Sequence, residues 1–413
     1  MLKIVGIIFV AFVFSFNCIL PEVLGENTVL KQTDVKSLIA ELSSTDPEKR
    51  GLAVCELGEM KDKAEEALPA LIKLLSDNTP IDTVACGKRG QFGRKYFPPK
   101  SSSPGKETAL SLASIGRALP VDTMEEKIVE PLLQVLKSPE SATRRSTVLT
   151  LNNLNSKKAV TSLIPLLKDP STEVKTETAV ALGSLRDTRA IEPLILAMND
   201  VSPTVKMRAI WALATMKDSK IESPDLERAL PLIINALQDK EEIVRREAVW
   251  ATGIFKNDAA VNSLIKMFGD ANKEIKHKLI WALTMIGNDQ AISPILSIAL
   301  NDPSDDIRRD AVWALGTIKN DAAVEGLIKL LKDANPEIRS KSVWALGTIK
   351  NDLAIVPLIS TLKDDNAEVR ANAAWALGIF KDVKAVQPLK DLLNDPNPKV
   401  RSKAAESIKI ITR

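Results

Sequence analysis

The sequence predicts an all-α protein, a superhelix of about eleven stacked helix pairs of about 31 residues each. Residues 312–321 and 343–352 both read VWALGTIKND and lie 31 positions apart. Looser copies of this segment recur along most of the chain, with three lengthened linkers. The composition is 45% hydrophobic and 26% charged, which excludes a disordered chain. A single helix pair cannot bury its apolar faces alone, so neighbouring pairs must stack.

Each repeat contains two helical patterns. The first follows an Asn or Asp cap, as in residues 322–332. A proline often lies about one turn inside this helix, which predicts a kink or a separate first turn; examples are Pro193, Pro294, Pro357 and Pro388. A short turn containing Asp then leads into the second helix. We expect these pairs from about Asp34 onward, with residues 401–413 as the capping helix.

Residues 1–25 are typical of a secretory signal peptide. Lys3 precedes an apolar run over residues 4–16, and Gly25 supplies a small residue for cleavage. An uncleaved membrane anchor is the alternative, because the run approaches the roughly 20 residues that a span needs. Lipoprotein attachment at Cys18 is disfavoured by the bulky and polar residues before it. We therefore expect an exported protein, periplasmic or extracellular, and membrane-anchored if the signal is uncleaved.

Three segments follow from this organisation: the signal peptide 1–25, divergent repeats over 26–143, and regular repeats over 144–413. The divergent part contains a long loop at 78–103, which is basic and interleaved with Phe92, Tyr96 and Phe97. Such a loop suits an acidic partner or an anionic membrane, or it is simply solvated. Export makes a disulfide between Cys55 and Cys86 possible, and two separate thiols are the alternative.

The repeat motif resembles a known family. Asp, five residues and Arg, followed by Ala-Leu-Gly and then Ala-Val-x-Pro-Leu-Ile, is similar to HEAT repeats of the phycobilisome-lyase-like type. The resemblance covers nearly the whole mature chain and is clearest over residues 169–401. It implies a HEAT/armadillo-like solenoid whose second helices line the concave side. It is specific for fold and not for function, because members include adaptors, pigment-attachment lyases, a hypusine-forming hydroxylase and designed binding scaffolds.

An acidic residue precedes the basic residue of each regular repeat by six positions. We interpret these pairs as structural, since a carboxylate at a turn accepts backbone N–H groups and a nearby cation can bridge adjacent repeats. The pairs are Asp169/Lys175, Asp200/Lys206, Asp239/Arg245, Asp270/Lys276, Asp302/Arg308, Asp333/Arg339, Asp364/Arg370 and Asp395/Arg401.

All six tryptophans occupy one repeat position, five residues after the basic residue. We call them the Trp column: Trp211, Trp250, Trp281, Trp313, Trp344 and Trp375. At 100° per residue this position lies opposite the apolar stripe of the second helix, so the indoles are predicted to face the concave side. An exposed row of indoles would bind a partner. In the alternative, each indole folds sideways onto a neighbouring repeat and is structural.

Polar and often cationic residues share the face of the Trp column. The candidate partner-binding cations are Arg208, Arg246, Lys278, Arg309 and Lys341, with Glu247 and Asp310 tempering their charge. This groove suits an extended or helical polypeptide with apolar anchors and acidic flanks, and a glycan that stacks on the indoles is the alternative. His277 lies on the same face and is interpreted as a solvated surface residue.

Composition argues against catalysis. The chain has one His and three Cys, too few for zinc, haem or di-iron sites. The hydroxylase of the similar family needs several His-Glu pairs, and this sequence has none. No nucleophile triad, phosphate loop or dinucleotide motif occurs. A net charge of +3 gives no reason to expect nucleic acid.

We therefore predict a non-catalytic, exported scaffold without a cofactor or metal, which binds a protein or peptide through the Trp column. We expect a monomer with no membrane span after signal cleavage. A pigment-lyase-like protein and a purely structural spacer of an envelope assembly are the alternatives.

Overall fold

The computed structural model describes residues 34–81, 102–219, 221, 223–269 and 272–413. Within these residues the chain is a curved array of helix pairs, and the eleven pairs predicted from the sequence are all present. The segment predicted to be a signal peptide, most of the basic loop, Cys86 and Asp270 lie outside the described residues. None of the described helices is long and apolar enough to cross a membrane.

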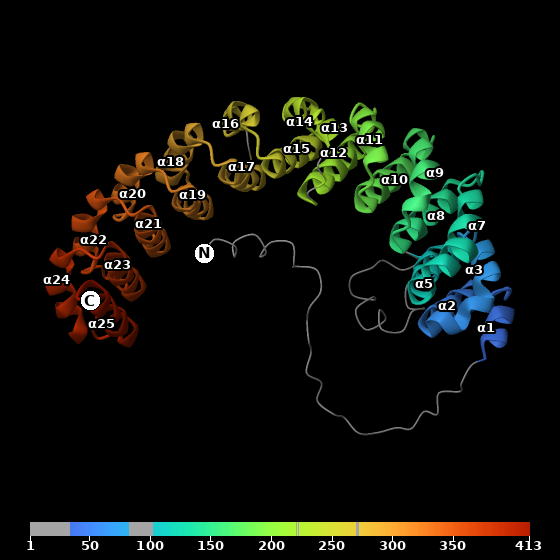
Figure 1. Ribbon diagram of the computed structural model, residues 1–413, viewed down its shortest axis with the longest axis horizontal. Coiled ribbons are helices and arrows are strands. Elements are labelled where there is room, and N and C mark those ends of the chain that lie inside the picture. Colours follow the sequence, from blue (N-terminus) through green and yellow to red (C-terminus); the bar gives the residue numbers. More distant parts are fainter. Residues whose placement is uncertain (1–33, 82–101, 220, 222, 270–271) are drawn as a thin grey trace, which may run out of the picture.

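The second helix of each pair lies on the inner side of the arc (Figure 1). In chain order these inner helices are α2 (Pro47–Met60), α5 (Pro104–Ala118), α8 (Ser141–Leu154), α10 (Thr172–Leu185), α12 (Pro203–Asp218), α15 (Glu242–Phe255), α17 (Lys273–Ile286), α19 (Asp305–Ile318), α21 (Pro336–Ile349), α23 (Ala367–Phe380) and α25 (Pro398–Ile411). Each packs against the inner helix before and after it. They form a continuous concave surface.

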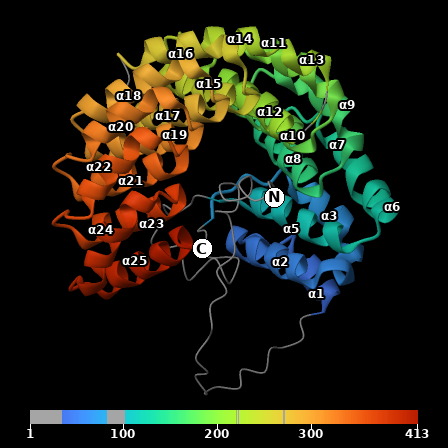
Figure 2. The ribbon, with the colours of Figure 1, turned by 60° about the vertical axis from the view of Figure 1, so that its left-hand side comes forward.

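The first helix of each pair lies on the outer side, and Figure 2 shows both rows following the same curve. The outer helices are α1 (Val35–Glu41), α3 (Leu68–Leu74), α7 (Glu130–Val135), α9 (Val160–Leu163), α11 (Ile191–Ala197), α14 (Leu230–Ala236), α16 (Val261–Met267), α18 (Ile292–Asn301), α20 (Val324–Leu330), α22 (Ile355–Thr361) and α24 (Val386–Asp391). Two short helices, α6 (Val121–Met124) and α13 (Pro224–Glu227), lie in lengthened linkers. Outer helices are mostly shorter than inner ones, and this difference is consistent with the curvature.

The prolines separate a first turn from the outer helices, as the sequence predicted. In one repeat a 3₁₀ turn at Asp352–Ala354 precedes α22, and Pro357 is the third residue of that helix. A proline there loses no intrahelical bond, because the first N–H groups of a helix have no internal acceptor. The same arrangement recurs before α11, α18 and α24.

The inner helices begin and end in a regular way. At α23 the side chain of Asn366 accepts hydrogen bonds from the N–H groups of Glu368 and Val369. Several inner helices end on a lysine with positive φ, such as Lys350 at 63°, while α17 ends on Gly287 at 73°. C-terminal residues in this left-handed conformation let the chain reverse toward the next outer helix.

The core runs along the whole array between the two rows. On α21 the side chains of Ile338, Val343, Ala345 and Leu346, which form its apolar stripe, are all fully buried. Ser342 is buried among them and donates its hydroxyl hydrogen to the carbonyl of Ile338. A buried hydroxyl satisfied within its own helix adds little cost to the apolar stripe.

Candidate binding surface on the concave face

The acidic and basic pairs join adjacent repeats. Arg339 donates two hydrogen bonds of 2.8 Å to Asp364, which begins the turn of the next repeat. It also donates to the carbonyl of Asp333 in its own repeat, at 3.0 Å. Oδ1 of Asp364 also accepts a hydrogen bond of 2.9 Å from the backbone N–H of Asn366. We call this arrangement the Asp–Arg clasp.

The clasp recurs along the array with Lys in place of Arg at three junctions. The bridging pairs are Arg50–Asp77, Arg144–Asp169, Lys175–Asp200, Lys206–Asp239, Lys276–Asp302, Arg308–Asp333, Arg339–Asp364 and Arg370–Asp395. The expected bridging of adjacent repeats is confirmed for these eight pairs. Burial opposes the ionisation of Asp364, yet the hydrogen bonds from Arg339 and Asn366 hold its pKa below the ordinary value.

The indoles of the Trp column do not form a row of fully exposed rings. Trp211, Trp250, Trp281, Trp344 and Trp375 are partly buried and pack against the core. Only Trp313, with 38% of its surface accessible, is exposed among the six. Sideways packing, the alternative left open by the sequence, therefore describes most of the column, although the five rings remain partly accessible.

A glycine of the preceding repeat receives the indole in at least three places. A Cβ built on Gly253 would lie 2.5 Å from Cζ3 of Trp281, and one on Gly316 would lie 2.6 Å from Cζ3 of Trp344. The third pair is Gly347 with Trp375, at 3.0 Å. Each glycine follows the tryptophan of its own repeat by three residues. The absence of a side chain at these glycines lets the indole lie this close to the preceding inner helix.

Most candidate cations on the concave face have an acidic neighbour. Arg246 forms an ion pair of 3.1 Å with Glu274 of the next inner helix. Arg309 similarly contacts Glu337 at 3.3 Å and also lies near Asp306. These contacts reduce the positive charge that the sequence had suggested for the groove.

Charges alternate in sign from one inner helix to the next, two residues after the clasp cation. The series is Glu177, Arg208, Glu247, Lys278, Asp310 and Lys341. Burial raises the pKa of Glu247, and the charges of Lys278, Arg208 and Arg246 act in the opposite direction. The Nε of Arg208 is buried without a hydrogen-bond partner. The alternation is present in the sequence, but it becomes visible only when equivalent positions of successive repeats are compared.

His277 is not an isolated surface residue. Its Nδ1 lies 2.5 Å from Oδ2 of Asp310 on the next inner helix, α19. Both side chains are about one-third exposed, at 33% and 37%. The contact links α17 to α19, a junction also bridged by Lys273 and Asp306 at 2.7 Å.

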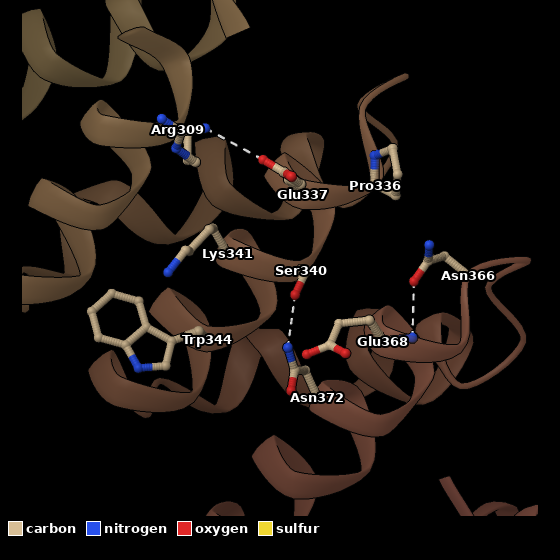
Figure 3. Close-up of a pocket in the computed structure, with 9 residues that line it drawn as sticks. All are labelled: Arg309, Pro336, Glu337, Ser340, Lys341, Trp344, Asn366, Glu368 and Asn372. Atoms are coloured by element: carbon tan, nitrogen blue, oxygen red, sulfur yellow. Dashed lines mark hydrogen bonds and ion pairs between the residues drawn. The ribbon is translucent and has the colours of Figure 1, made fainter. Parts of the chain in front are cut away.

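A shallow depression of about 340 Å³ lies beside Trp344 on α21. Figure 3 shows Arg309 directed toward Glu337, while the amide of Asn372 meets Ser340 Oγ at 2.7 Å. Glu368, also at the rim, is paired with Lys399. Lys341 extends on the Trp344 side, and no described residue forms an ion pair with it. The sequence identified Arg309, Lys341 and Trp344 here but not the neutral and acidic rim.

The structure does not establish the predicted disulfide between Cys55 and Cys86, and it shows no metal site among the described residues. Cys55 is buried on α2 and belongs to a disulfide, but its predicted partner Cys86 lies outside the described residues, so the pairing stays a prediction. Among the described residues no group of three or more potential metal ligands lies together.

Comparison with family models identifies the class of protein that this fold defines. The model described as HEAT repeats matches residues 129–214, 191–284, 261–333 and 324–409, which together span more than half of the chain. A PBS lyase HEAT-like repeat matches residues 49–77. The chain therefore belongs to the HEAT-repeat family, and its resemblance to that family is confirmed.

One solved structure agrees with this chain at the level of the fold. A structure in which Kap95p binds RanGDP contains a chain that matches with a TM-score of 0.66 and 13% identity, over 93% of this chain and 58% of that one. An engineered protein solved by a structural genomics consortium matches with 22% identity and a TM-score of 0.40, over 92% of this chain and 99% of that one. A search of the curated proteins returns no match.

Proposed function

We propose that this HEAT-repeat solenoid is a non-catalytic scaffold that binds a polypeptide along its concave face. The observation that carries the proposal is the Trp column: five partly accessible indoles and the exposed Trp313 lie on consecutive inner helices, from α12 to α23. Partly accessible aromatic rings offer large apolar contact area at a low cost in side-chain entropy. The rigid array places them in fixed order.

The concave face also supplies polar contacts in register with the rings. Alternating charges from Glu177 to Lys341 run beside the Trp column. A partner with apolar side chains and interspersed charges would complement both series, and the charges would contribute specificity more than affinity.

The test compares two double variants in affinity capture from a native cell-envelope extract. Trp313→Ala with Trp344→Ala should abolish capture of the same partner while circular dichroism shows unchanged helical content. Leu353→Ala with Val356→Ala removes exposed apolar side chains from the outer row and serves as the matched control. Equal capture by both variants and by the unchanged protein would refute binding through the concave face.

We further propose export through the N-terminal segment, on the basis of the apolar run over residues 4–16. Sequencing the N-terminus of the mature protein tests this proposal. A mature chain starting near Glu26 supports cleavage, whereas one starting at Met1 supports the anchored form.

A pigment-lyase-like activity is the second candidate, favoured by the PBS lyase HEAT-like match over residues 49–77. Incubation of the purified protein with a bilin tests it, because pigment attachment or chaperoning would change the absorbance spectrum. An unchanged spectrum counts against this candidate and leaves the scaffold proposal in place.

A further inference from the structure

The repeat position that holds glycine before three other tryptophans holds a larger residue before Trp313. Trp281, Trp344 and Trp375 pack on Gly253, Gly316 and Gly347, each of which follows the tryptophan of its own repeat by three residues. The equivalent residue before Trp313 is Thr284, which is buried and donates its hydroxyl hydrogen to the carbonyl of Ile280.

By this register the side chain of Thr284 takes the place of the glycine on which the other three rings pack. Even a single Cβ at Gly316 would approach Trp344 Cζ3 to 2.6 Å, and threonine adds two further heavy atoms. The residue in this register before Trp250 is Ala214, which is smaller than threonine, and Trp250 is partly buried. A β-branched side chain at this position is found only before the one exposed ring among the six tryptophans.

Lys341, on the following inner helix α21, comes 28 residues after Trp313, the spacing that also joins Arg309 to Glu337, and it forms no ion pair with a described residue. Arg309, one turn before Trp313 on α19, is paired with Glu337. The positive charges of Arg208 and Lys278 favour the ionised form of Glu247, so these two cations have a carboxylate near them. On the following helix, α21, Lys341 is exposed beside the depression that Arg309 and Trp344 also line.

We propose that Trp313 and Lys341 form the primary anchor of the concave face, which takes a bulky apolar side chain and a nearby carboxylate from one polypeptide segment. The apolar side chain packs on the accessible face of the Trp313 indole. The carboxylate pairs with Lys341 at the depression. This inference rests on the proposed function and names the chemistry of its partner.

A random-peptide phage library is the probe that tests this anchor. The unchanged protein should enrich peptides in which an acidic residue lies near a bulky apolar one. With Lys341→Glu the same library should enrich basic residues at the acidic position. Enrichment of peptides without an acidic residue, or the same peptides from both proteins, overturns the proposed role of Lys341.

Affinities of the enriched peptides, synthesised with a fluorophore and measured by anisotropy, test the role of Trp313. Trp313→Ala should weaken peptide binding by about tenfold or more, because removing an aromatic ring that becomes buried in an interface commonly has an effect of this size. Thr284→Gly should also weaken binding, because it lets the Trp313 ring fold onto α17 without removing any group that contacts the peptide.

Thr317→Gly is the matched control for Thr284→Gly. Thr317 is also within an inner helix and also donates its hydroxyl hydrogen to a carbonyl four residues earlier, that of Trp313, but it is exposed. Both changes place glycine in a helix at similar cost. Equal affinities of the two glycine variants would overturn the proposed effect of Thr284.

The outcomes separate this inference from the broader function. In one outcome the peptides bind the Trp313→Ala variant with the same affinity as the unchanged protein but lose binding to Trp281→Ala or Trp375→Ala. This result would contradict the anchor while still supporting binding on the concave face. Peptides that bind all three tryptophan variants equally, or an absence of enriched peptides, count against both.

Discussion

At the scale of single residues, the clasp depends on the geometry of arginine. Arg339 is 16% exposed and Asp364 is 10% exposed, so neither charge is well solvated. The planar guanidinium spans the carboxylate of one repeat and the carbonyl of another, which an ammonium group on one flexible stem does less well. Arginine is therefore more than a source of charge at these junctions.

Replacing Arg339 with Ala should lower the free energy of unfolding by about 2 kcal/mol, because Asp364 loses its charged donor while remaining partly buried. Urea denaturation measures this loss, and peptide capture should be largely unchanged. Lys399→Ala is the control, since its ion pair with Glu368 is 56% exposed on both sides and should contribute less than about 1 kcal/mol. Equal losses in the two variants would contradict the importance of the clasp.

The sequence predicted that the basic residues can bridge adjacent repeats, but it did not show which carboxylate each one pairs with. The fixed spacing of six residues identified Asp333 and Arg339 as one structural unit. In the structure the guanidinium of Arg339 pairs with the carboxylate of Asp364 and contacts Asp333 through its backbone carbonyl. A periodic pattern cannot distinguish contacts within a repeat from contacts between repeats, because both recur with the same period.

The orientation of the indoles was less predictable for a related reason. A helical wheel places Trp344 opposite the apolar stripe of its own helix. The wheel carries no information about the neighbouring helix onto which the ring folds. The signal that was present is Gly316, a glycine inside a helix, which often marks a close approach. Reading this glycine together with Thr284 in the preceding repeat would have distinguished Trp313 from the other rings.

At the scale of the element, the inner helices end in a conformation that lysine adopts at some cost. Lys350 has φ of 63°, where an L side chain crowds the following carbonyl oxygen, and α17 uses Gly287 at the same point. The repeated Lys is compatible with the helix C-terminus because its charge interacts favourably with the terminal carbonyls.

Lys350→Gly should therefore raise the free energy of unfolding, by about 0.5–1 kcal/mol. Thermal or urea unfolding detects the change. Lys329→Gly, at an exposed position within α20, removes the same charge and should instead destabilise by about 1 kcal/mol. Changes of the same sign in both variants would show that charge rather than backbone conformation decides the effect.

At the scale of the whole molecule, the clasps make stability depend on pH. The pKa values of Asp77, Asp169, Asp239, Asp302, Asp364 and Asp395 are all held below the ordinary 3.8. The unfolded chain therefore binds protons more readily than the folded one. This contribution is fully present above about pH 4 and is lost as the pH falls through the folded values.

We expect the melting temperature to fall progressively below about pH 4 and to vary little on this account nearer neutrality. A pH series of thermal unfolding measures it. Asp364→Asn should reduce the acid dependence as well as the stability, since one shifted group is removed. A melting temperature that stays constant on acidification would contradict the linkage.

The clasps also determine how far a disturbance travels along the array. Each one connects a repeat to its immediate neighbour, as Arg370 does with Asp395, and the inner helices likewise pack on the adjacent ones. Such a molecule behaves as a chain of coupled segments, with cooperativity that decays with distance. Removal of α24 and α25 should therefore loosen the segment beside them while leaving the far end of the arc folded.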